Sequence, residues 1–336
     1  MRQTIADIAR SAQVSTATVD RVLNGRAGVR LPTRERVLAA ARASGYLPAP
    51  GPLPEAPPVR LDFILQSGPN TFMDLLASHL ELACAARGVE LRLHRIDGFS
   101  PDALAAVLRE LPPGTGGVGL IGLDHPVVRE AIRATVARGI ALLTLVSDIA
   151  NVPSAGYVGI DNRAAGRLAG HLLGRFVPGS AGEVALFAGS LSYRGHEERE
   201  MGFRHILADE FPTLRAVELR EVRDDLERSY REARKLLAAH PGLRGIYNIG
   251  AGNRGIAKAL EEAGRAHEVV FIGHELTEHT RRFLLAGTMD AVIDQNPRVE
   301  AREAVDRLLR AARGEPGPEP IPIRIHAIFR ENMPEI

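Results

Sequence analysis

From residue 60 onward, short apolar segments alternate with amphipathic helical stretches, and this alternation restricts the chain to few folds. The apolar segments form two sets of about five. Near-continuous apolar strands separated by helices are typical of parallel sheets covered on both faces. The pattern predicts an α/β body of two doubly wound parallel-sheet subdomains. The expected strands are LDFILQ, VELRLHRI, GVGLIGLD, IALLTLVSD and YVGID, then EVALFAG, AVELREV, GIYNIG, VVFIGHE and AVIDQN.

The first 46 residues have a different pattern, that of a small all-α head of three short helices. Thr4, Ser15 and Thr33 are placed to cap these helices. Only residues 12–14 separate the first two helices, which is the spacing of a helix-turn-helix. A plain three-helix bundle would share the periodicity, but it does not explain the polar strip at the start of the second helix. That strip consists of Ser15, Thr16, Thr18 and Arg21.

The charge of the chain is unevenly distributed. Residues 1–46 hold eight Arg against Asp7, Asp20 and Glu35, a balance of +5, whereas the remaining 34 basic and 38 acidic residues give −4. A basic head on a mildly acidic body is typical of a head that meets phosphate, although a solvated arginine surface would have the same charge. The expected partner of the head is double-stranded DNA.

A proline-rich stretch separates the head from the body. Residues 48–59 contain six prolines in twelve positions, which excludes a helix and predicts a stiff, extended linker. The expected domains are a head over 1–47, this linker, and a body over 60–336 whose subdomains comprise 60–160 with 296–325 and 161–295 with 326–336.

Other features argue against export, membrane insertion and metal binding. No run of 18 apolar residues and no basic-then-apolar leader is present, so we expect a cytoplasmic protein without membrane contact. Cys84 is expected to be a small core residue. The histidines are scattered and no His/Cys cluster has metal spacing, so neither a metal nor a cofactor is expected.

The head sequence TIADIARSAQVSTATVDRVLNG, followed by TRERVLAAARASGYLP, resembles the DNA-binding head of the LacI/GalR family of bacterial repressors. The body resembles that family's periplasmic-binding-protein-like effector domain and is similar to ribose-binding proteins. The resemblance covers nearly the whole chain. It implies a homodimeric repressor of a catabolic operon that binds a pseudo-palindromic operator. A small effector, usually a sugar, would close the two subdomains and alter DNA affinity.

The resemblance also assigns DNA contacts on the recognition helix. Thr16 and Ala17 match the specificity-setting positions, and Thr18, Arg21 and Asn24 match further groove or backbone contacts. An Arg can donate two hydrogen bonds to guanine, whereas Ala offers only apolar contact. The predicted DNA-binding residues are Thr4, Ser15, Thr16, Ala17, Thr18, Arg21 and Asn24.

Two features of the head depart from the family pattern. Asp20 stands where a Ser is usual, and we expect it to hold Arg21 in place rather than to accept from cytosine. The proline-rich linker over 48–59 cannot form the hinge helix that relatives insert into the minor groove. A stiff tether is the simpler interpretation.

Polar residues at the expected strand ends fall where doubly wound sheets bind ligands. Each one alone could be a helix cap, but a set at several strand ends favours a binding site. A sugar needs an aromatic ring on its C–H face and polar pairs on its hydroxyls. The resemblance matches Arg199 to the effector-binding Arg and Glu275 to a position that is Asp in relatives. The predicted ligand-binding residues are Asn70, Phe72, Asp124, Asp161, Arg199, Asn248, His274, Glu275 and Gln295.

The segment RGHEERE, residues 194–200, is unusually charged. It is either a solvated helix start or part of a site for a polyol, a sugar acid or another charged small molecule. In the second case Arg194, His196 and Arg199 would point inward.

An enzyme is the alternative function. The pattern GxGxxG occurs at 117–122 inside an expected strand and at 250–255 between a strand and a helix, with Glu275 twenty residues further on. The second occurrence is similar to an NAD-type dinucleotide fingerprint, so a dehydrogenase on the same α/β body is conceivable. No proton-transfer or nucleophilic set lies nearby, so we expect no enzyme. An exported transport binding protein is a weaker alternative, because the chain has a DNA-binding head and no leader.

Overall fold

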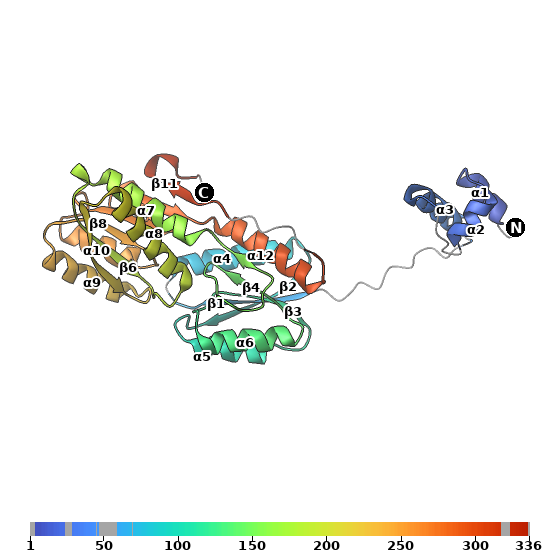
Figure 1. Ribbon diagram of the computed structural model, residues 1–336, viewed down its shortest axis with the longest axis horizontal. Coiled ribbons are helices and arrows are strands. Elements are labelled where there is room, and N and C mark those ends of the chain that lie inside the picture. The colour runs from blue at the N-terminus through green and yellow to red at the C-terminus, as the bar shows by residue number, and fades with distance from the viewer. Residues whose placement is uncertain are drawn as a thin grey trace. The chain divides into compact units, whose positions relative to one another are not determined.

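The structure is a computed structural model of the 336-residue chain and describes residues 4–23, 29–44, 46, 59–68, 70–316 and 323–334, without the side chains of Leu31 and Arg42. Contacts along the chain separate two units, Met1–Pro58 and Val59–Ile336 (Figure 1). The predicted linker lies outside the described residues except for Val59. None of the helices in the described part of the chain combines the length and apolar character that a membrane crossing requires.

Three helices form the first unit, and two begin where the sequence predicts. The Asp7 carboxylate accepts hydrogen bonds from the backbone N–H (3.0 Å) and hydroxyl (2.7 Å) of Thr4, which starts the first helix. The Ser15 hydroxyl accepts from the backbone N–H of Thr18 (3.2 Å) and starts the second. The helices are α1 (Ile5–Ser11), α2 (Thr16–Leu23) and α3 (Leu31–Ala43).

The third helix begins two residues before the predicted cap. The backbone N–H groups of Thr33 and Arg34 already donate to the Arg30 carbonyl, so Thr33 lies in the first turn and the prediction that it caps α3 is wrong. A proline at the second helical position is compatible with this early start. The core of the unit comprises Ile8, Ala9, Ala12, Val19, Val22, Val37, Ala40 and Ala41.

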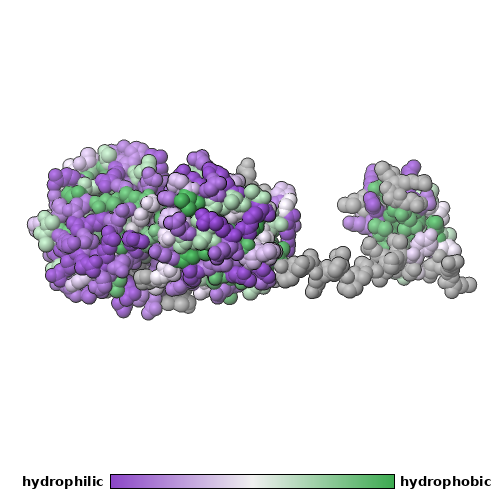
Figure 2. All heavy atoms as spheres, turned by 90° about the horizontal axis from the view of Figure 1, so that it is seen from below, coloured by the Kyte–Doolittle hydropathy of each residue, from purple (hydrophilic) through white to green (hydrophobic). Residues whose placement is uncertain are grey.

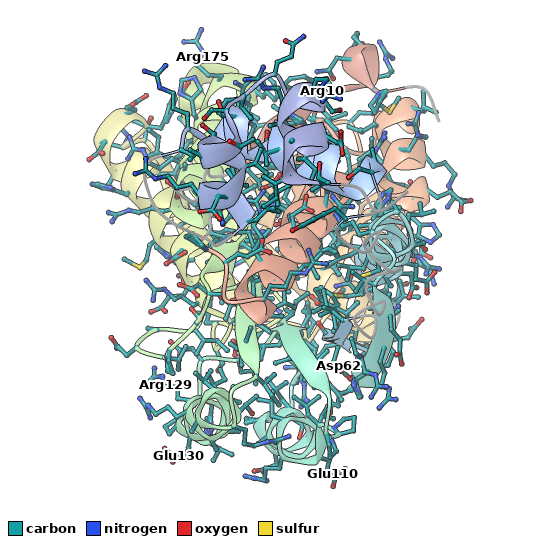
Figure 3. All side chains as sticks on the ribbon, turned by 90° about the vertical axis from the view of Figure 1, so that its right-hand side faces the viewer. Arg10, Asp62, Glu110, Arg129, Glu130 and Arg175 are labelled. Carbon is teal, nitrogen blue, oxygen red and sulfur yellow. The ribbon has the colours of Figure 1, made fainter. Side chains whose placement is uncertain are left out.

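Two separate sheets organise the second unit, which confirms the predicted α/β class. The first has the order β2-β1-β3-β4-β5 and is entirely parallel. Its strands are β1 (Arg60–Gln66), β2 (Glu90–Ile96), β3 (Thr115–Leu120), β4 (Ala141–Leu145) and β5 (Tyr157–Val158). Asp62 is buried within β1, where it accepts from the Thr115 hydroxyl (3.0 Å) and lies 2.7 Å from His94 Nε2 (Figure 3).

The second sheet has the order β11-β10-β9-β8-β6-β7, and β11 alone among these strands runs antiparallel to its neighbour. Its strands are β6 (Gly182–Ala188), β7 (Leu214–Glu221), β8 (Leu243–Asn248), β9 (Val270–His274), β10 (Ala291–Asp294) and β11 (His326–Ile328). Each of the ten predicted apolar segments overlaps one strand. The sequence did not predict β11, because HAI is too short to show a period.

Helices cover both faces of each sheet, which explains the continuous apolar strands (Figure 1). Along β1, Phe63 packs under α4 and α12, whereas Ile64 packs against α5 and α6. In the second sheet, Leu186 faces α7 and α8, and Phe187 faces α9, α10 and α11. The helices are α4 (Thr71–Ala85), α5 (Pro101–Glu110), α6 (Pro126–Ala137), α7 (Asn162–Phe176), α8 (Arg194–Glu210), α9 (Leu226–Ala239), α10 (Asn253–Glu262), α11 (Glu278–Ala286) and α12 (Pro297–Ala312).

We call the first sheet with α4, α5, α6 and α12 the first lobe, and the second sheet with α7 to α11 the second lobe. The chain crosses between the lobes three times: before α7, before α12 and before β11. A parallel bridge between Ile160 and Ile323 joins two of these crossings. Short 3-10 turns follow α7 (Pro178–Ser180) and β11 (Arg330–Asn332).

Glycines bring α7 and α8 into close contact. A Cβ atom on Gly166 would lie 1.9 Å from the backbone oxygen of Arg199, and one on Gly202 would lie 2.1 Å from that of Arg163. Both positions therefore exclude any side chain. Because α8 carries Arg199, this contact sets the depth at which that side chain enters the body.

The surface and the single cysteine fit the same architecture. Figure 2 shows polar residues over most of the visible face of the body, with hydrophobic residues in scattered spots. Cys84 is buried, and desolvation raises the pKa of its thiol to about 11, as expected of a core residue. The large exposed hydrophobic side chains come from different elements and are Tyr46, Leu82, Phe176, Met201 and Leu285.

Candidate functional site

The start of α2 presents the predicted DNA-reading side chains at the surface of the head. Ser15, Thr16, Ala17 and Arg21 are exposed, whereas Thr18 is half-buried with its hydroxyl 2.9 Å from Ser15 Oγ. An open hollow between α2 and the start of α3 gathers most of this strip. Its lining is Ser15, Ala17, Thr18, Asp20, Arg21, Val29, Arg30 and Thr33.

The predicted contact Thr4 is not among the residues that line this hollow. Thr4 stands at the start of α1, where its hydroxyl donates to Asp7. Asn24 lies outside the described residues. Asp20 lines the hollow beside Arg21, and its predicted role in holding Arg21 stays a prediction.

In the body, a pocket lies between the two lobes at the carboxyl ends of their strands. It encloses about 530 Å³ of space not filled by protein atoms, including the part that opens to solvent. Six predicted ligand residues line it: Asn70, Phe72, Arg199, His274, Glu275 and Gln295.

Arg199 supplies the buried cation of the pocket. It is 3% exposed, and its Nε donates to Asn162 Oδ1 (2.7 Å). Its Nη1 donates to the carbonyl of Ile249 (3.0 Å), and its Nη2 to Gln295 Oε1 (3.4 Å). Three bonds from three segments hold the guanidinium in one orientation, so it is preorganised for a ligand.

Glu275 is joined to this arrangement through Gln295. The Gln295 Nε2 donates to Glu275 Oε1 (2.5 Å), whereas Glu275 Oε2 is buried without a hydrogen-bond partner. Burial, with a smaller effect from Asp294, raises the pKa of Glu275 to about 8. At neutral pH the side chain therefore carries a proton and can donate it to a ligand. Glu275 also has a left-handed backbone (φ 69°), which is uncommon outside glycine.

His274 provides a second unused polar atom in the pocket. Its Nε2 lies 2.7 Å from the hydroxyl of Tyr247, and its Nδ1 is buried without a partner. Burial, helped by Arg199, lowers the pKa of His274 and keeps the ring neutral. Among the described residues, the Tyr247 hydroxyl has no other hydrogen-bond acceptor. We therefore assign the Tyr247 hydroxyl as the donor and His274 Nε2 as the acceptor. The Nδ1 then carries the hydrogen and is a buried donor without a partner.

Asp224 is a pocket residue that the sequence did not predict. It is buried, its Oδ1 accepts from the backbone N–H of Ala251 (2.8 Å), and its Oδ2 accepts from Asn70 Nδ2 (3.5 Å). Burial raises its pKa. The available signal was the Asp-Asp pair after β7: Asp225 caps α9, which leaves Asp224 free to face the cleft.

Several hydrogen bonds join the lobes. They include the bond from Asn70 to Asp224, the bond from the Tyr193 hydroxyl to the carbonyl of Gly98 (2.5 Å) and the bond from the Gly195 N–H to the Ser147 hydroxyl (3.1 Å). Both sides of the pocket are thus held together in this structure.

The charged segment 194–200 divides between the pocket and the surface. His196 lines the pocket, its Nδ1 lies 3.0 Å from the Ser190 carbonyl, and burial lowers its pKa to about 3. Arg194 does not point inward, which agrees with a solvated helix start at this residue. Its Nε donates to Glu198 (2.8 Å), one turn further along α8, and the pair lies outside the pocket.

Two predicted ligand residues, Asp124 and Asp161, line a different, open hollow. Asp124 accepts from Arg129 Nε (2.6 Å), a side chain labelled in Figure 3. Asp161 caps α7 by accepting from the Ala164 N–H (2.9 Å). The correction for Asp124 has a simple cause: β3 ends at Leu120, so Ile121 occupies the pocket position.

Asn248, another predicted ligand residue, braces a loop and is not among the residues that line the pocket. It is fully buried, and its Nδ2 donates to the Gly250 carbonyl (2.9 Å) and to Asn253 Oδ1 (2.7 Å). Asn248 lies at the end of β8, as the strand-end pattern predicts. Its side chain, however, bonds to residues that follow it closely in the sequence.

The glycines of the GxGxxG segments make room for protein. A Cβ on Gly250 would lie 2.5 Å from Asp224 Oδ1, and one on Gly255 would lie 2.4 Å from the carbonyl of Leu226. In the other segment, a Cβ on Gly119 would lie 2.4 Å from the Phe63 ring. A dinucleotide fingerprint needs glycines that face a pyrophosphate, and these glycines face the start of α9 and the core of the first sheet.

Comparisons with known proteins agree with this organisation. Residues 61–316, 256 of the 336, match the family model of the periplasmic binding protein domain, and residues 4–49 match that of the bacterial regulatory proteins, lacI family. The chain belongs to the periplasmic binding protein domain family and has a lacI-family head.

Curated relatives match a short part of the chain. The chain is 62% identical over 42 residues to an uncharacterized HTH-type transcriptional regulator in the aml 5' region of Streptomyces limosus, which is 12% of this chain and 12% of that protein. It is 56% identical over 46 residues to the HTH-type transcriptional regulator MalR of Streptomyces coelicolor, covering 14% and 13%. The matches thus span about one eighth of each relative.

Solved structures match the periplasmic-binding-protein body. GanP, a glucose-galactose binding protein from Geobacillus stearothermophilus, has a TM-score of 0.76 at 22% identity, covering 83% of this chain and 100% of that one. A solute binding protein from Burkholderia graminis, in complex with D-arabinose, has a TM-score of 0.76 at 24% identity, covering 82% and 96%. At these identities the likeness establishes the fold.

Proposed function

We propose that the protein is a DNA-binding transcription regulator, a repressor of a catabolic operon, controlled by a small sugar-like molecule in the cleft of its body. The observation that carries this proposal is that one chain joins a lacI-family head to a periplasmic-binding-protein body with unused hydrogen-bonding atoms in its pocket. It acts in the cytoplasm as a homodimer on a pseudo-palindromic operator, because the head of this family recognises one half-site.

The chemistry of the pocket supports a polyhydroxylated ligand. Phe72 offers an apolar face, and Arg199, His274 and Glu275 offer hydrogen-bond donors held in place by the protein. Apolar walls with a few convergent polar groups are typical of small-molecule sites. The relatives with similar bodies include proteins in complex with D-arabinose and with α-D-tagatopyranose.

The chemistry of the head supports DNA as the partner. Thr16, Ala17 and Arg21 are exposed on one side of α2, and the head carries a net charge of +5. Arg21 reads a guanine, while Ser15, Thr18, Thr4 and Asn24 contact the phosphate backbone or nearby groove edges.

The test is selection of bound duplexes from random DNA by the full-length protein, followed by affinity measurements at several salt concentrations. We expect one pseudo-palindromic motif and a logarithm of the affinity that falls linearly with the logarithm of salt. An unenriched pool would overturn the proposal. A melting temperature raised by NAD alone would favour the dehydrogenase instead.

A further inference from the structure

We propose that the ligand of the cleft is a deoxy sugar, bound with its hydroxyl-bearing edge against the second lobe and its bare hydrocarbon edge against the first. This inference rests on the proposed function and specifies the chemical class of its effector. It follows from the two walls of the pocket, which differ in kind.

The second lobe contributes every charged or titratable side chain of the pocket that the structure describes, including Tyr193, whose hydroxyl donates to the carbonyl of Gly98 in the first lobe. Arg199 and Asp224 lie on this wall, together with the unpartnered Nδ1 of His274 and Oε2 of Glu275. A buried polar atom without a partner is costly, so a ligand that pairs with it gains affinity. These atoms require hydroxyl or ring oxygens on the facing edge of the ligand.

The first lobe presents mostly hydrocarbon. Its wall contains Phe72 and Met73 from the first turn of α4, and Ile121 and Val146, which directly follow β3 and β4. Nothing on this stretch can accept from or donate to a hydroxyl through a side chain. The carboxylate expected here, Asp124, instead pairs with Arg129 outside the pocket.

Three polar side chains of the first lobe also line the pocket. The Asn70 amide accepts from the Phe72 N–H and donates to Asp224, so protein partners hold its orientation. The Ser147 hydroxyl accepts from the Gly195 N–H and keeps its own O–H to donate. Gln66 lies where the pocket meets the mouth of the cleft, so it reaches one end of a ligand and not its middle.

A fully hydroxylated sugar would therefore place at least one hydroxyl against Ile121 and Met73. That hydroxyl would lose its water without gaining a partner, which costs affinity. A ligand with a methyl or methylene at the same place gains apolar contact instead. Discrimination against one added hydroxyl by an apolar wall is limited to roughly 100-fold, so we expect a preference of about 10- to 100-fold.

Calorimetric titration of the full-length protein with matched sugars tests this. The pairs are L-fucose with L-galactose, L-rhamnose with L-mannose, and 2-deoxy-D-ribose with D-ribose. We expect the deoxy member of at least one pair to bind at least tenfold more tightly than its parent. Equal or tighter binding of every parent, or no binding by any deoxy sugar, would overturn the inference.

Variants of the apolar wall provide a second readout. Ile121→Asn and Met73→Gln each add an amide of similar size, and we expect each to reduce the preference for the deoxy sugar at least fivefold. Ile121→Val, the matched control, retains it. An unchanged preference in both amide variants would contradict the inference. Two substitutions at separate positions are used because one of them could disturb folding, which thermal unfolding detects.

The DNA selection described above separates this inference from the proposed function. If a specific operator is found but no deoxy sugar binds, only the ligand class fails. If no operator is found, the proposed function fails even when a deoxy sugar binds.

Discussion

At the scale of single residues, the sequence predicts some lining residues of the pocket correctly and misplaces others. Arg199 and Gln295 are polar residues next to strand ends or a charged helix start, and both line the pocket. Asp124 also follows an apolar strand, but that strand ends four residues earlier, at Leu120. The Asp124 carboxylate pairs with Arg129 outside the pocket. The pattern of polar and apolar residues locates a strand end only to within a few residues. A shift of a few residues changes which side chain lines the pocket, so the sequence does not identify that side chain.

Arg21 provides the sharpest prediction for the head. We expect Arg21→Ala to weaken operator binding by about 1–3 kcal/mol and to relax the choice of base at one position, because a bidentate contact to guanine is lost. Selection from random DNA measures the second effect. Arg175→Ala, on α7 of the other unit, is the control and should leave both the motif and the affinity unchanged. An equally sharp motif from Arg21→Ala would rule out base reading by this residue.

Glu275 predicts how the stability of the body changes with pH. Its pKa in the folded protein is about 8, above the unfolded value, so the folded state binds more protons between these values. The stabilisation is complete at low pH and is lost as the pH rises from about 4.5 toward 8, with a slope of up to about 1.4 kcal/mol per pH unit. The buried Glu300, whose pKa is also raised, adds to the same trend.

Urea unfolding at pH 5, 6, 7 and 8 measures this dependence. We expect Glu275→Gln to flatten the fall in unfolding free energy, since a neutral amide does not titrate. Glu130→Gln, at an exposed position on α6, should keep the slope of the unsubstituted protein. Parallel curves for all three proteins would show that Glu275 is ionised in the folded state at these pH values.

At the scale of elements, the sequence predicted most of the architecture. Ten strands appear in the predicted segments because parallel strands buried on both faces must be apolar throughout. The antiparallel β11 was missed, since three residues show no period. Thr33 was misplaced because helix α3 starts at Leu31-Pro32, and a proline in the first turn is as good a start as a hydroxyl cap. Sequence patterns alone do not distinguish these starts.

The contact between α7 and α8 predicts a sensitive glycine. Gly166→Ala would place a Cβ 1.9 Å from the Arg199 carbonyl oxygen, so the helices must separate. We expect a loss of about 1–3 kcal/mol in unfolding free energy, as for other overpacked sites, together with weaker ligand binding because Arg199 moves. Gly242→Ala, where a Cβ meets no atom within 4 Å, is the matched control. Equal stability of the two variants would show that α7 and α8 can adapt.

At the scale of the whole molecule, a proline-rich segment of the chain joins a DNA-reading unit to a ligand-binding unit. The sequence predicted both units from composition and period, because each has its own apolar core. It did not predict the difference between the two pocket walls, which depends on how side chains from distant strands meet. The claim that links the units is that ligand in the body changes the affinity of the head for DNA.

The most direct test of that claim is operator affinity, measured by fluorescence anisotropy with full-length protein, with and without each sugar that binds the body. We predict that at least one such sugar changes the operator dissociation constant by fivefold or more, the lower end of a typical coupling between two sites. Arg199→Ala should abolish the change while keeping affinity for DNA. An operator affinity that stays constant at saturating sugar would contradict the account.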